Sequence, residues 1–204
     1  MVNNNDIDKI FKGINKIYFT AYRAYYMTHN LHFSEKEISE IIKNSIFLRF
    51  SQYTYYYMLV IELHKLFVKK GNNKCSFYKL LSHLDKIQHK SLFKFIENQL
   101  NSITQTTLTK LEKLRDNLYA HTDLDVDSIA LNYTPNWDEL ELLINIGQNI
   151  INQINKDIYN KSFRIPPIEK VHVKRFLTNH NKFMKANNDY LIMILNNKNI
   201  QNNR

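Results

Sequence analysis

The sequence predicts an all-α protein, an antiparallel bundle of four to five helices with a C-terminal appendage. The chain of 204 residues contains only three Gly and three Pro, too few for the many turns of an all-β protein. Long uninterrupted segments are rich in Leu, Ile, Lys, Glu and Asn. Within these segments, apolar residues recur three and four positions apart, which is the spacing of a helix with one buried face.

Three helices are predicted in the N-terminal part of the chain. Residues 6–28 carry the first apolar stripe. Ser34 and Glu37 form a capping box that opens a second helix, which continues to Arg49. The segment 50–68 is apolar on nearly every side, so we expect a helix that lies at the centre of the bundle or is covered by a partner.

In the second half of the chain, the breaks between predicted helices are less distinct, but capping residues mark the start of two of them. Its predicted helices span residues 76–85, 93–103, 108–118 and 137–159. Ser76 is suited to cap the first of them. The polar and β-branched residues 104–109 predict a break before the third. Asn136 and Glu139 form a capping box at the start of the last.

The domain organisation is predicted to be a helical bundle over residues 1–160 and a basic, partly disordered C-terminal extension over residues 161–204. Pro166 and Pro167 indicate a hinge between them. His172 and His180, with neighbouring Lys and Arg residues, are candidates for RNA contact, and a solvated tail is the alternative.

The chain carries a net charge of +9, and a basic surface attracts polyanions such as RNA. The alternative is that this charge serves solubility and reflects the coding bias of an AT-rich genome. The single cysteine, Cys75, cannot form an internal disulfide, and no metal-binding spacing is present, so neither a metal nor a cofactor is predicted. Without a signal pattern or an apolar run long enough for a bilayer, we expect a cytoplasmic protein with no membrane partner.

The most chemically specific stretch of the chain is residues 114–123, Leu-Arg-Asp-Asn-Leu-Tyr-Ala-His-Thr-Asp. Arg115 presents a permanently charged planar fork that matches phosphate oxygens. His121 titrates near neutrality, so it can take a proton from a ribose 2′-hydroxyl or give one to a leaving 5′-oxygen. This combination predicts a metal-independent attack on an RNA phosphodiester, with Asp116 as the polar residue that follows the arginine.

On a regular α-helix Arg115 and His121 would not face each other, because they lie about 120° apart around the axis. They converge if Arg115 bends along the helix, if the last turn unwinds, or if two copies of the helix meet across a two-fold axis. We favour the dimer, in which one His121 acts as base and the other as acid. Asp116 or Asn117 would orient the histidine or the backbone, and Tyr119 would stack on a base or bind a phosphate.

A purely structural interpretation of the same residues remains open. A histidine near a helix C-terminus is stabilised by the helix dipole, and an arginine beside an aspartate often forms a surface ion pair. Glu62 stands alone among apolar residues, where it would pair with Arg49, Arg115 or another cation, or border the cleft.

The segment 111–123 resembles the signature of the HEPN superfamily, in which an arginine and a polar residue precede a histidine. The Tyr-Ala-His-Thr-Asp ending, the helix start at Trp137 and the tract 55–67 are similar to the AbiU-type branch associated with abortive infection. This resemblance covers roughly residues 35–160. It matches Arg115, Asp116 and His121 to the motif positions.

The resemblance implies a HEPN-like helical bundle that forms a homodimer and acts as a metal-independent endoribonuclease. Relatives of this kind are toxins held by an antitoxin, often a nucleotidyltransferase, or take part in antiphage defence. The superfamily also includes non-catalytic copies. Two alternatives therefore stand: a module that binds RNA, a nucleotide or a partner without chemistry, and a subunit of a larger defence complex.

Overall fold

The computed structural model of the protein describes most of the chain. It covers residues 4–33, 36–69, 73–84, 89–119 and 132–162, and in the C-terminal segment residues 175, 176, 178, 179, 182, 183, 185–187, 189 and 190. The helices are α1 (Asn4–His32), α2 (Lys36–Asn44), α3 (Ile46–Phe67), α4 (Phe77–His83), α5 (Lys90–Asn101), α6 (Gln105–Lys113), η1 (Leu114–Tyr119) and α8 (Trp137–Tyr159). These elements confirm the all-α prediction.

The contact pattern divides the chain into two compact units. Unit 1 contains Met1–Tyr25 and Thr54–Pro166, and unit 2 contains Tyr26–Tyr53 and Pro167–Arg204. The division therefore falls within α1 and within α3. None of the helices in the described ranges is both long enough and apolar enough to cross a bilayer.

In unit 1, α1 and α8 are packed closely through Tyr18. The Tyr18 side chain is fully buried, and its hydroxyl donates to the backbone carbonyl of Ile144, 3.1 Å away. A Cβ placed on Gly147 would lie 2.8 Å from two atoms of the Tyr18 ring. Only glycine therefore permits this separation of the two helices, and α8 is fixed in position against the predicted apolar stripe of α1.

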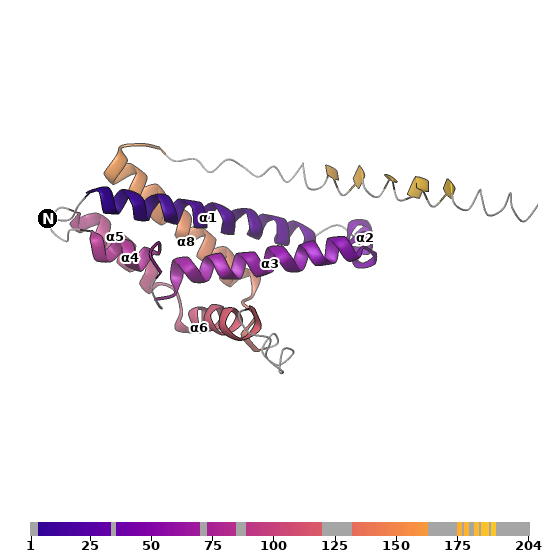
Figure 1. Ribbon diagram of the computed structural model, residues 1–204, viewed down its shortest axis with the longest axis horizontal. Coiled ribbons are helices and arrows are strands. Elements are labelled where there is room, and N and C mark those ends of the chain that lie inside the picture. Colours follow the sequence, from indigo (N-terminus) through magenta and orange to yellow (C-terminus); the bar gives the residue numbers. More distant parts are fainter. Residues whose placement is uncertain are drawn as a thin grey trace, which may run out of the picture. The chain divides into compact units, whose positions relative to one another are not determined.

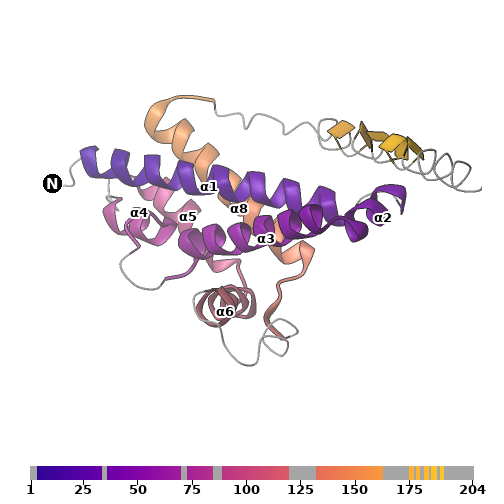
Figure 2. The same cartoon turned by 45° about the vertical axis from the view of Figure 1, so that its right-hand side comes forward.

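The second half of α3 is buried in the same unit. Leu59, Leu63 and Phe67 are fully buried, and the Phe67 ring lies 5.2 Å from that of Phe77 at the start of α4. In Figures 1 and 2, this part of α3 runs beside α1, and α6 lies on the side of α3 away from α1. The prediction of a central helix is thus confirmed for this half of the segment 50–68.

Unit 2 contains the first half of α3, where several large apolar side chains are exposed. Ile46, Phe47, Phe50 and Tyr53 are 77%, 69%, 66% and 55% exposed. Their spacing places them along one side of the helix. They form an exposed apolar stripe, which we call the α3 stripe.

Several predicted boundaries were wrong, and in two cases a side-chain hydrogen bond decides where a helix begins. The first helix runs to His32 rather than Thr28. The second ends at Asn44, because the Ser45 hydroxyl accepts from the Leu48 amide and so starts α3. Of the residues 104–109, where a break was expected, only Thr104 lies outside a helix. Its hydroxyl accepts from the Thr107 amide and caps α6, which begins at Gln105.

Two predicted helix starts were confirmed. The Ser76 hydroxyl accepts from the Lys79 amide at the start of α4. Asn136 and Glu139 form the reciprocal capping box of α8, at 2.8 and 2.7 Å. Ser34 lies outside the described residues.

Candidate active site

The candidate site lies on α6 and on η1, which continues it. Leu111 and Leu114 are buried, as the apolar stripe predicted. Because these two side chains fix which face of the helix points inward, they also fix the direction in which the following residues project.

A carboxylate at the start of α8 holds α6 in place. The Glu139 carboxylate accepts from Lys110 Nζ at 2.9 and 2.8 Å and from Thr107 Oγ1 at 3.0 Å, while also accepting from the Asn136 amide. The Lys110 and Glu139 side chains are only 21% and 18% exposed. We call these four residues the Glu139 cluster, and through it the helix carrying the motif is bonded to the N-terminus of α8.

The charge of Glu139 is maintained by its hydrogen bonds. Desolvation by burial alone would raise its pKa, but the hydrogen bonds from Lys110, the Asn136 amide and Thr107, with the charge of Lys110, together lower it. Glu139 is therefore a carboxylate at neutral pH, and the Lys110 ammonium keeps its counterion.

Tyr56 and Trp137 lie next to this cluster. The Trp137 ring contacts the rings of Tyr25 and Tyr56 edge-on, at 6.2 and 6.4 Å. Burial, and then the charge of Glu139, raises the pKa of Tyr56. Its hydroxyl is buried and has no hydrogen-bond partner among the residues that the structure describes. Tyr56 thus remains a neutral phenol beside the junction of α6 and α8.

The motif itself begins in a π-helical segment, which the sequence did not predict. Residues Leu114–Tyr119 form η1, a single π-helical element directly after α6. Hydrogen bonds in a π-helix join residues five apart, so the α-helical angle of about 100° per residue does not apply here. The estimate of about 120° between Arg115 and His121 assumed a continuous α-helix, which residues 114–119 do not form; since His121 lies outside the described residues, the angle itself stays a prediction. Single-turn π segments occur frequently at functional sites.

Within η1, Arg115 and Asp116 form an ion pair. Arg115 Nη1 donates to Asp116 Oδ1, and the two side chains are 45% and 24% exposed. A guanidinium has five N–H donors, so one bond to Asp116 leaves donors for a phosphate. The aspartate holds the arginine in one orientation at the surface. This is also the surface pair that the structural interpretation predicted.

The remaining predicted site residues are only partly placed. His121 lies outside the described residues, which stop at 119 and resume at 132. Asn117 and Tyr119 have their backbone in η1. Glu62 bonds to Lys65 at 2.7 Å, so it takes the partner predicted as another cation. Over the described ranges, no group of three or more His, Cys, Asp or Glu side chains is arranged to hold a metal ion.

Sequence reasoning missed the Glu139 cluster. It assigned Glu139 a capping role only, and it gave Thr107 and Lys110 no role. Their spacing of three on one helix face was an available signal, because such residues are neighbours on the helix surface. Nothing in the sequence indicated that both would meet a carboxylate 29 or more positions away.

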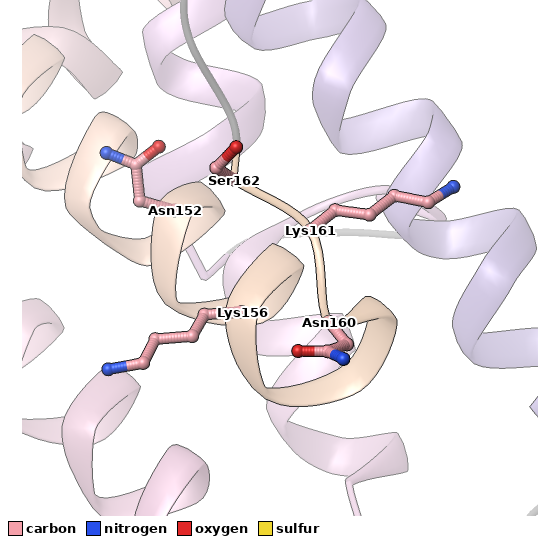
Figure 3. A pocket seen from close by; sticks show the side chains of 5 residues that line it. All are labelled: Asn152, Lys156, Asn160, Lys161 and Ser162. Carbon is pink, nitrogen blue, oxygen red and sulfur yellow. The ribbon is translucent and has the colours of Figure 1, made fainter.

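A pocket of about 360 Å³ lies at the other end of α8 from Glu139. Asn152, Lys156, Asn160, Lys161 and Ser162 line it. Figure 3 shows the two lysine side chains pointing away from each other, so their charges do not converge on one ligand. This pocket offers no catalytic constellation comparable to the motif.

Comparison with known protein families identifies the family of the chain. The AbiU2 family of HEPN proteins matches residues 5–177. No curated protein and no solved structure shows significant similarity to the chain. The family match includes α6, η1 and the whole segment 114–123.

Proposed function

Since the chain belongs to the AbiU2 family of HEPN proteins, we propose that it is a metal-independent endoribonuclease acting as a toxin or antiphage-defence effector. The observation that carries this proposal is the exposed Arg115, which Asp116 holds on the π-helical segment η1. This segment ends two positions before His121 in the sequence. An exposed, oriented guanidinium at the start of the motif is what phosphate binding requires.

The proposed reaction needs only groups of the chain. His121 removes the proton of the ribose 2′-hydroxyl, and the 2′-oxygen attacks the adjacent phosphorus. The bond to the 5′-oxygen breaks, and that oxygen receives a proton from the second His121 of a homodimer. Arg115 binds the non-bridging oxygens as their charge increases, and Asp116 orients Arg115. The products are a 2′,3′-cyclic phosphate and a 5′-hydroxyl end, with Asn117 and Tyr119 as further substrate contacts.

The homodimer in this proposal is supported by the α3 stripe. Four large apolar side chains that are more than half exposed are a surface for another protein rather than for water. We assign this surface to a second copy of the chain. An antitoxin, such as a nucleotidyltransferase, or another defence component would act on the assembled dimer.

The test is cleavage of tRNA and mRNA by the purified protein, with the ends of the products mapped. We expect 2′,3′-cyclic phosphate ends, no effect of EDTA, and no cleavage of DNA, which lacks the attacking hydroxyl. His121→Ala should reduce the rate by about 10²–10⁴, because it removes an acid–base group. His89→Ala is the matched control, since His89 makes no side-chain capping hydrogen bond at the start of α5. Equal cleavage by His121→Ala and the parent would refute the site assignment, and loss with EDTA would refute the mechanism.

A second candidate is a non-catalytic module that binds RNA, a nucleotide or a partner. The Arg115–Asp116 ion pair favours it, because such a pair is also common on surfaces without catalysis. Under this alternative, RNA binding persists while no RNA yields cyclic-phosphate ends. The same experiment therefore distinguishes the two functions.

A further inference from the structure

The positive charge of the chain is concentrated at its C-terminal end. Residues 161–204 contain nine Lys and Arg but only two Asp and Glu. Residues 1–160 contain nineteen and seventeen, so the larger part of the chain is nearly neutral. Of the net charge of +9, the last segment therefore supplies +7. Attraction of a polyanion should accordingly act on this segment more than on the helical bundle.

Exposed aromatic side chains accompany this charge at regular intervals. The described residues between 175 and 190 are helical, and Phe176, Phe183 and Tyr190 are 57%, 68% and 58% exposed. On a regular helix, positions seven apart repeat with a drift of only about 20° and a rise of about 10 Å, so this spacing is typical of side chains that share one face.

Basic side chains lie directly beside two of these rings. Arg175 precedes Phe176 and Lys182 precedes Phe183, and Lys185 follows within the next turn. All three basic residues are exposed. Arg175 and Lys182 are also seven positions apart, so at helical spacing they follow the rings at an offset of about 100°, whereas Lys185, two positions after Phe183, falls on the opposite side. We call five of these residues the tail face: Arg175, Phe176, Lys182, Phe183 and Tyr190.

We propose that the tail face binds single-stranded RNA. Aromatic rings stack on unpaired bases without sequence preference, and adjacent cations follow the phosphate backbone. A spacing of about 10 Å corresponds to roughly three nucleotides of a stacked strand, which rises about 3.4 Å per residue. This inference rests on the proposed function, because it supplies the RNA substrate with a second, sequence-independent contact.

The family match ends at residue 177, before Lys182, Phe183 and Tyr190. Most of the tail face is thus a feature of this chain and is not part of the matched domain. An amphipathic basic helix also suits an anionic membrane surface. We assign RNA to this face because the proposed function already brings RNA to the chain, and a membrane surface is an outcome of the test.

The test measures binding without cleavage. The full-length protein is titrated into a fluorescently labelled single-stranded oligonucleotide with 2′-O-methyl groups throughout, which cannot undergo 2′-oxygen attack. Fluorescence anisotropy gives the affinity at several salt concentrations. A triple variant, Phe176→Ala with Phe183→Ala and Tyr190→Ala, should bind at least tenfold more weakly, because each stacked ring contributes strongly to affinity.

A second variant tests the cations. Arg175→Gln with Lys182→Gln should reduce the slope of log affinity against log salt by about 1.4, at about 0.7 per phosphate contact on a single strand. The matched control carries the same loss of charge elsewhere, through Lys90→Gln and Lys94→Gln. These lysines are exposed, and the control should retain affinity within about threefold of the parent.

Parental affinity in both tail-face variants would overturn the inference. So would weakened binding to vesicles containing phosphatidylserine with unchanged binding to RNA, which would assign the surface to a membrane. Failure of the proposed function is a separate result. If the parent cleaves no RNA and the ring variant still binds the oligonucleotide more weakly, the ribonuclease proposal fails and the RNA-binding face stands.

Discussion

Substitution of Glu139 by Gln should weaken the attachment of the motif helix to α8. The variant keeps the shape of the side chain and one amide oxygen, which can still accept from the Asn136 amide because Gln also serves in capping boxes. It removes the negative charge opposite Lys110, whose Nζ lies 2.9 and 2.8 Å from the two carboxylate oxygens. The Lys110 ammonium is then left half-paired at a site that water reaches poorly.

The expected cost lies between two known limits. Exposed ion pairs contribute about 0–1 kcal/mol, whereas breaking a fully buried pair costs about 3–5 kcal/mol. The Lys110 and Glu139 side chains are 21% and 18% exposed, so their pair lies between these cases. We expect a loss of about 1.5 kcal/mol in the free energy of unfolding, equivalent to a decrease in Tm of about 3–6 °C for a chain of this size.

The loss should depend on pH in a defined direction. The pKa of Glu139 is lowered in the folded protein from its ordinary value of 4.5. A carboxyl group of this kind stabilises the fold above its unfolded pKa, and that stabilisation is lost as the pH falls through the folded pKa. The difference in the free energy of unfolding between the parent and Glu139→Gln should therefore have its full size at pH 7 and should decrease below pH 4.5.

Urea unfolding followed by circular dichroism, at pH 7 and in steps below pH 4.5, measures both effects. Glu141→Gln is the matched control, because Glu141 lies on the same helix but is exposed. It should leave the free energy of unfolding nearly unchanged at every pH. If Glu139→Gln unfolds like this control at pH 7, or if its deficit persists unchanged in acid, the assignment of Glu139 as the anchor of α6 is wrong.

Two further substitutions test the packing and the site. Gly147→Ala should destabilise the protein by about 1–3 kcal/mol through overpacking against the Tyr18 ring, despite the gain of about 1 kcal/mol in helix propensity; an unchanged urea midpoint would show that the ring moves freely. Arg115→Ala should lower RNA cleavage by at least tenfold and leave Tm within about 2 °C, because its exposed pair with Asp116 contributes little to stability. A full rate in this variant would remove Arg115 from the mechanism.

The fold was largely predictable because apolar spacing reports burial directly. The stripe from Ile7 to Tyr25 identified the buried face of α1, and Asn136 with Glu139 located the start of α8. Two of the failures occurred where a hydroxyl decides a boundary. Ser45 lies within an apparently continuous helical pattern, yet its side chain bonds to the Leu48 amide and starts a new helix. Spacing does not distinguish a serine that caps from one that faces solvent.

The candidate site was predictable in composition but not in geometry. Residue types alone identified Arg115 and Asp116, since a guanidinium next to a polar group suits phosphate binding whatever the backbone does. The π-helical segment was not predictable, because Leu111, Leu114 and Leu118 satisfy an α-helical stripe equally well.

The change of helix type occurs where α6 is no longer bonded to Glu139 of α8, one turn after Lys110. Leu111 and Leu114 remain buried, so the bundle sets the direction of the segment as far as Leu114, and the orientation of Arg115 is set locally by Asp116. A change at Glu139 should therefore alter cleavage through the position of the whole segment, whereas a change at Asp116 should alter it through Arg115 alone.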